Sequence, residues 1–142
     1  MKIKTDNFLL LSISIGLVYL WFGALKFFPG LSPAEGLAKE TIQLLTFGLI
    51  PESSSIILLA IIESGIGILL IFNFLKKVAL YAALVHILVT FFPIFLFAES
   101  MFSPSAFSFT LLGQYIFKNI VYVAALLLLL KVEKQSTKKT KI

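Results

Sequence analysis

The stretch SIILLAIIESGIGILLIFN, residues 55–73, decides the fold, because it is long and apolar enough to cross a lipid bilayer and yet carries a glutamate near its centre. An acidic side chain at the centre of a membrane helix costs about 2.5–3.5 kcal/mol on insertion scales. Glu63 therefore needs a partner, a cavity or a function, and other segments of the chain must supply it.

The composition places the whole chain in the same class as this stretch. Of the 142 residues, 59% are hydrophobic and 13% are charged, whereas a soluble domain is about half apolar and a quarter charged. The sequence therefore predicts a membrane protein with almost no room for a separate soluble domain. The chain has no cysteine and one histidine. It therefore cannot by itself hold a disulfide, a thiol redox centre, an iron–sulfur cluster or a haem ligated by two histidines.

Four segments have the length of about 20 apolar residues that a membrane helix needs. They cover about 8–28, 54–74, 78–98 and 109–130. The fold class predicted is an all-α membrane protein, a four-transmembrane-helix bundle over residues 8–130. The first segment is too long for a signal-peptide core and no small-residue cleavage site follows it, so we expect it to be retained.

Several local patterns predict how the four spans pack. The short turn at 73–77 predicts that the two middle spans form an antiparallel hairpin, and Pro93 predicts a kink in the third span. Small residues four apart allow helices to approach closely. Such pairs occur in the first three spans, as Ser12/Gly16, Ala60/Ser64 and Ala79/Ala83.

The lysines predict the orientation, because loops on the cytoplasmic side carry an excess of positive charge. Nine of the twelve flank one side: Lys2, Lys4, Lys76, Lys77, Lys131, Lys134, Lys138, Lys139 and Lys141. We therefore expect a multi-pass protein of the bacterial cytoplasmic (inner) membrane with both termini in the cytoplasm. Residues 1–7 form the N-terminal end and 131–142 a basic tail. The net charge of +5 indicates topology and contact with the lipid bilayer rather than nucleic-acid binding.

The first outer loop contains a helix start signal. Ser32 is a capping residue, Pro33 follows at the first helical position, and Glu35 stands three residues after the cap. The pattern predicts a capping box and a short interfacial helix over about 33–46 that covers the bundle.

Polar side chains recur at helical spacing within all four spans, which predicts a polar stripe on each helix and a polar bundle interior. The stripes comprise Tyr19, Gly23 and Lys26; Glu63, Ser64 and Gly67; Ala82, His86 and Thr90; and Gln114, Tyr115, Lys118, Asn119 and Tyr122.

The depth of these residues follows from the rise of about 1.5 Å per residue. Glu63 lies about 14 Å and Lys118 roughly 10–14 Å below the outer ends of their spans, and His86 lies about 12 Å above the inner end of its own. We therefore expect Glu63 to meet Lys118, with His86 slightly below the pair and Lys26 above it, at the outer edge.

Each of these residues has a structural and a functional interpretation. Glu63 and Lys118 fit a structural ion pair or a ligand or proton site, and His86 fits an interhelical hydrogen bond or proton transfer. Lys26 fits snorkelling to the outer interface or a site role. On the functional interpretation, Glu63 and His86 are the catalytic candidates. The candidates for holding a cofactor are Lys26, Gln114, Tyr115, Lys118 and Asn119. No metal site is predicted.

The first two spans carry motifs of a known family. The first reads GLVYLWFGALKF (16–27), with Gly23 three residues before Lys26, and the second reads ESGIG (63–67), which begins with Glu63. Over residues 8–130 the chain resembles the DoxX-like family of small four-helix bacterial membrane proteins. The outer helix that starts at Ser32 and the stretch GQYIFKN (113–119) mark a subgroup.

The resemblance implies a fold and a direction for the function. Members resemble the small subunit of a thiosulfate:quinone oxidoreductase, others are linked to membrane redox complexes, and many have no assigned activity. The basic residue often found just before the first span appears here only as Lys2 and Lys4, further back, and the absence of a cysteine pair excludes a thiol mechanism.

Three functions are compatible with these features. The first is a small subunit of a quinone-linked redox complex, in which Lys118, Lys26 and Gln114 donate hydrogen bonds to the quinone and Glu63 and His86 pass protons. Without a covalently carried cofactor, its electrons come from a partner chain. The second is a non-enzymatic scaffold or accessory subunit that binds other membrane subunits or a second copy of itself. The third is a small proton-coupled transporter, against which the lack of an inverted repeat argues.

Overall fold

The computed structural model describes residues 5–104 and 108–139. The lysine pattern is described only in part. Outside the described residues lie Lys2, Lys4 and Lys141, together with the side chains of Lys138 and Lys139. The helices in chain order are α1 (Thr5–Leu25), α2 (Glu35–Leu45), α3 (Glu52–Ile71), α4 (Lys76–Val89), α5 (Phe92–Leu96), α6 (Ala98–Met101), α7 (Leu111–Phe117) and α8 (Asn119–Lys139).

Four helical stretches in the described part of the chain are long and apolar enough to cross a membrane. They are Phe8–Leu25, Glu52–Ile71, Lys76–Leu96 and Leu111–Ser136. Each overlaps one of the four spans predicted from the sequence, so the prediction of an all-helical chain with four apolar spans is confirmed. The third stretch combines α4 and α5, and the fourth combines α7 and α8.

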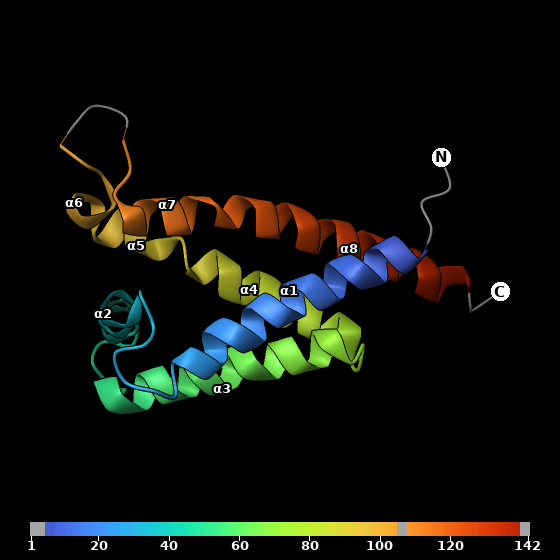
Figure 1. Cartoon of the computed structure of the whole chain (residues 1–142), viewed down its shortest axis with the longest axis horizontal. Coiled ribbons are helices and arrows are strands. Elements are labelled where there is room, and N and C mark those ends of the chain that lie inside the picture. Colours follow the sequence, from blue (N-terminus) through green and yellow to red (C-terminus); the bar gives the residue numbers. More distant parts are fainter. Residues whose placement is uncertain (1–4, 105–107, 140–142) are drawn as a thin grey trace.

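The long helices run between two ends of the molecule (Figure 1). The start of α1, the turn from α3 to α4 and the end of α8 lie at one end, which we name the hairpin end. The opposite end carries α2, α5 and α6, and we name it the α2 end. The ribbons lie close together toward the hairpin end and diverge toward the α2 end, where α2 stands between them (Figure 1).

Glycines set the close contact between α1 and α3. A Cβ atom added at Gly67 would lie 2.5 Å from the backbone nitrogen of Leu20 and 2.7 Å from the carbonyl oxygen of Gly16. One added at Gly23 would lie 2.7 Å from the backbone nitrogen of Ser64. Only residues without a side chain allow the two backbones to approach so closely. The prediction of close packing at Gly16 and Ser64 is thus confirmed.

The apolar core lies in the half of the molecule near the hairpin end. Its members come from α1, α3, α4 and α8, and they include Ile15, Leu70, Ala79, Leu80, Ala83, Leu126 and Leu129. Ala79 and Ala83, the small pair predicted in the third span, are completely buried there.

Two of the spans are interrupted. The third breaks between α4 and α5 beside Pro93, as the sequence predicts, because proline cannot donate the helical hydrogen bond. The fourth is interrupted only in its hydrogen-bond pattern at Lys118, where the backbone keeps right-handed helical angles (φ −60°, ψ −19°), and no proline or glycine signals this point. A hydrogen bond joins these two places. The Asn119 side-chain nitrogen donates to the Thr90 hydroxyl oxygen at 2.9 Å.

The outer helix differs from its prediction at the start. It begins at Glu35 rather than at Pro33, and no side chain caps it, so the predicted capping box is wrong. The physical reason is that the Glu35 carboxylate is engaged elsewhere. It accepts hydrogen bonds from the Gly30 amide at 2.8 Å and from the Lys39 ammonium at 2.6 Å. These bonds, with that from Lys39 the stronger influence, lower the pKa of Glu35 below its usual value.

Candidate functional site

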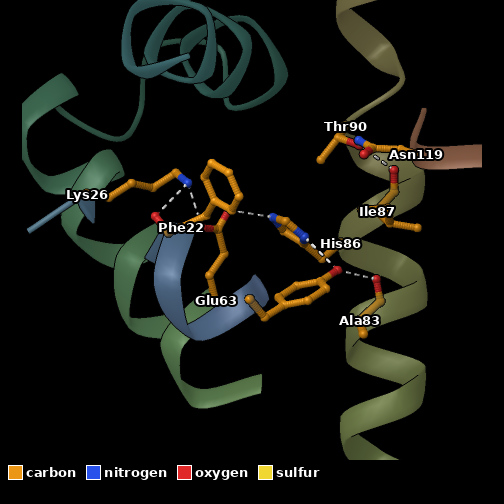
Figure 2. A network of polar contacts seen from close by, with 9 residues as sticks. Phe22, Lys26, Glu63, Ala83, His86, Ile87, Thr90 and Asn119 are labelled. Carbon is orange, nitrogen blue, oxygen red and sulfur yellow. Dashed lines mark hydrogen bonds and ion pairs between the residues drawn. The ribbon is translucent and has the colours of Figure 1, made fainter. Parts of the chain in front are cut away.

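A buried ion pair joins the first two spans. Lys26 directly follows α1, and its ammonium group lies 2.6 Å from one carboxylate oxygen of Glu63, in the middle of α3 (Figure 2). The Lys26 and Glu63 side chains are only 9% and 8% exposed. The Lys26 ammonium also donates to the carbonyl oxygen of Phe22 at 3.3 Å. The carboxylate thus compensates the charge of the lysine inside the protein.

The second oxygen of the same carboxylate reaches the third span. His86, in the last turn of α4, places its Nε2 atom 3.1 Å from Oε1 of Glu63. On the other side of the imidazole, Nδ1 lies 3.1 Å from the Tyr19 hydroxyl oxygen. This hydroxyl group is also within 2.9 Å of the Ala83 carbonyl oxygen. We name Lys26, Glu63, His86 and Tyr19 the polar row; Figure 2 labels the first three.

The partner of Glu63 corrects one prediction from the sequence. Glu63 pairs with Lys26 and not with Lys118, because helical side chains lean toward the N-terminus of their helix. The N-terminus of α1 lies at the hairpin end, so Lys26 extends back into the molecule instead of outward. The proximity of Glu63 and His86 was predicted correctly.

Lys118 stands in a different environment. It caps the C-terminus of α7, and its ammonium group lies 4.1 Å from the ring centroid of Tyr115, a cation–π contact. No ion pair of Lys118 occurs in the described part of the chain. The neighbouring Asn119 is tied to Thr90 at the two helix breaks.

A cavity of about 360 Å³ connects these two groups. The polar row lies on one side, from α1, α3 and α4, and Tyr115, Lys118 and Asn119 line it from α7 and α8. Most of the remaining wall is apolar, and it includes Val18, Phe22, Leu59, Ile87, Leu112 and Ile116. Leu37, Ala38, Thr41 and Ile42 of α2 complete the lining.

Six of the seven predicted site residues therefore line one cavity: Glu63, His86, Lys26, Tyr115, Lys118 and Asn119. The exception is Gln114, whose side-chain nitrogen donates to the Phe109 carbonyl oxygen at 3.3 Å and which is not part of the lining. Tyr19 was placed on the polar stripe of the first span but not in the predicted site. Its position seven residues before Lys26, two helical turns away on the same face, is the signal that could have included it.

The arrangement combines hydrogen-bond donors with groups that can carry a proton. Lysine and tyrosine side chains can donate to oxygen atoms, and an adjoining carboxylate and imidazole can exchange protons with a bound molecule. No cluster of three or more histidine and acidic side chains suited to a metal ion occurs among residues 5–104 and 108–139. Searches against protein-family models, curated proteins and solved structures find no match to the chain.

Proposed function

We propose that this chain is an integral membrane protein whose cavity binds a small amphipathic molecule from the bilayer, with a quinone as the first candidate. In this proposal the four spans form a bundle, α2 lies at the membrane interface, and the protein serves as a subunit of a quinone-linked redox complex. The observation that carries the proposal is the polar row of Lys26, Glu63, His86 and Tyr19 on the wall of an otherwise largely apolar cavity.

The size and lining of the cavity support a small ligand. Pockets for small molecules typically have about 300–1,000 Å³, mostly apolar walls and a few well-placed polar groups. The cavity of about 360 Å³ fulfils all three conditions. It suits a quinone ring better than a long lipid, because the apolar walls could lie against a flat ring and the polar groups could reach its carbonyl oxygens.

The polar row supports a role in proton transfer. Reduction of a quinone to a quinol takes up two electrons and two protons, so a site for this reaction needs hydrogen-bond donors and a proton route. Lys26 and Lys118 supply donors on two sides of the cavity. Glu63 and His86, in contact at 3.1 Å, supply groups that can transfer protons. The electrons come from a partner chain.

The test is photolabelling of the purified protein in lipid nanodiscs with a short-chain quinone that carries an azide. The expected result is that labelled peptides map to the cavity walls on α1, α3 and α4, and that unlabelled quinone competes. Glu63→Gln removes the charge that holds Lys26 and His86 in place, so we expect about tenfold weaker competition. Glu52→Gln is the matched control, because Glu52 is exposed in the first turn of the same helix.

Two results would contradict the proposal. One is labelling spread evenly over lipid-facing residues in both variants. The other is unchanged competition in a Glu63→Gln protein that melts at the wild-type temperature. If the protein also copurified with a stable partner assembly that contains no quinone, the scaffold function would replace the redox function.

A further inference from the structure

The charges around the cavity do not balance. Its lining includes three side chains that are charged at neutral pH, Lys26, Glu63 and Lys118, together with His86. Lys26 and Glu63 neutralise each other at 2.6 Å. Lys118 has no carboxylate partner in the described part of the chain. With a neutral imidazole, the lining therefore carries one net positive charge, and with a protonated imidazole it carries two.

The surroundings of Lys118 do not remove this charge. Its ammonium group lies 4.1 Å from the centroid of the Tyr115 ring, and a cation–π contact attracts a cation without neutralising it. Besides Lys118 and Tyr115, the titratable groups of the lining are Tyr19, Lys26, Glu63, His86 and Tyr122. Of these only Glu63 is an acid in the usual pH range, and its two oxygens already face Lys26 and His86.

Lys118 is exposed at the surface of the chain as well as lining the cavity. In a membrane a cation exposed to lipid is costly, and such residues usually lie opposite an anion or in a functional cavity. We propose that the ligand of this cavity carries one negative charge, a singly charged oxygen anion on an apolar body, and that Lys118 binds this anion. The polar row then holds the neutral part of the ligand. The inference rests on the proposed function and narrows its ligand from any quinone to an acidic one, such as a quinone with an ionised ring hydroxyl.

Two naphthoquinones form a matched pair of probes for the charge. 2-Methyl-1,4-naphthoquinone is neutral. 2-Hydroxy-1,4-naphthoquinone has the same ring system, but its hydroxyl group is a vinylogous carboxylic acid and is ionised at neutral pH. Binding of each is measured as the rise in melting temperature of the full chain in nanodiscs of zwitterionic lipid. The partition of each probe into empty nanodiscs is measured separately and used to correct its concentration.

The wild-type protein is expected to bind the hydroxy compound at least tenfold more tightly than the methyl compound. Lys118→Gln should bring this ratio close to one, and Lys118→Arg, which keeps the charge, should preserve it. Lys77→Gln is the control, because Lys77 is exposed at the hairpin end and does not line the cavity, and it should leave the ratio unchanged. Equal binding of the two probes, or a preference that Lys118→Gln does not affect, would overturn the inference.

The same experiment separates this inference from the proposed function. If both naphthoquinones bind equally, the quinone site stands and the anion site is overturned. Decanoate, an anion without a ring, serves as a third probe. If decanoate binds in a Lys118-dependent way while neither naphthoquinone binds, the anion site stands and the quinone function fails. If no probe raises the melting temperature, both are overturned.

Discussion

At the scale of single residues, the pair of Lys26 and Glu63 is the most consequential feature. Both side chains are almost completely withdrawn from the surface, and they meet at 2.6 Å. A buried pair contributes little net stability compared with apolar residues of the same volume, because both charges lose their hydration. Removal of one partner is far more costly, since the other charge then remains buried and unpaired.

This asymmetry gives a first prediction. Glu63→Leu should destabilise the protein by about 3–5 kcal/mol, whereas the double variant Lys26→Met/Glu63→Leu should recover most of that loss. The measurement is the free energy of unfolding of wild type, both single variants and the double variant in one detergent. If the losses of the two single variants simply added up in the double variant, the two charges would not be coupled, and the pair would have no structural role.

At the scale of the elements, the contact between α1 and α3 depends on Gly67 more than on Gly65, which lies two positions earlier in the same helix. A Cβ atom at Gly67 would meet the backbone of Leu20 at 2.5 Å, and backbone atoms cannot move aside as a flexible side chain can. A Cβ atom at Gly65 would meet nothing within 4 Å.

The second prediction follows from this difference. Gly67→Ala should lower the free energy of unfolding by at least about 1–3 kcal/mol, because the two helices must separate. Gly65→Ala in the same helix should leave it unchanged or raise it by up to about 1 kcal/mol, because alanine restricts the unfolded chain. Thermal unfolding of the two variants side by side tests this prediction. Equal effects would mean that the close approach of α1 and α3 does not limit stability.

Elements also show where sequence-based prediction succeeds and where it ends. The four spans follow directly from long apolar runs, and the break near Pro93 follows from the missing amide hydrogen of proline. The break at Lys118 has no local cause in the sequence, because it lies among residues that are compatible with a continuous helix. Beside it lies a contact across the molecule, the hydrogen bond from Asn119 to Thr90.

The sequence predicted which residues lie near one another, but not which of them form the ion pair. Six of the seven residues line one cavity, because helical periodicity and depth depend only on spacing along each helix. The partner of Glu63 depends on the rotation of each helix and on the direction of a long side chain, which spacing does not determine. The spacing alone therefore placed Lys26 at the outer edge of its span, although its ammonium group extends inward to Glu63.

At the scale of the whole molecule, the chain has a clear division into two ends. The turn between α3 and α4 and the end of α8 lie at the hairpin end, and α2 and α6 lie at the other (Figure 1). The lysine pattern predicts that the hairpin end faces the cytoplasm. The absence of native cysteine allows a direct test, since any thiol label must react with an introduced residue.

The third prediction uses two exposed positions at opposite ends. A membrane-impermeant maleimide should label Ser100→Cys, in α6, in intact cells, and it should label Gln135→Cys, near the end of α8, only after the membrane is opened. Labelling of both variants in detergent is the control for reactivity. The reverse pattern would mean that the lysine asymmetry does not set the orientation of this protein.

The separation of the apolar core from the cavity has a consequence for how a ligand arrives. The core fills the half of the molecule near the hairpin end, while the cavity is bounded by α2 and by the helix breaks at Thr90 and Lys118. If the four spans cross a bilayer as proposed, these two halves lie in different lipid leaflets. On the proposal that the cavity binds a lipid-soluble molecule, we expect that molecule to enter from the leaflet around the α2 end, and one made on the opposite side would first have to flip across the membrane. For such a molecule the rate of that flip would then limit how fast the site can be refilled.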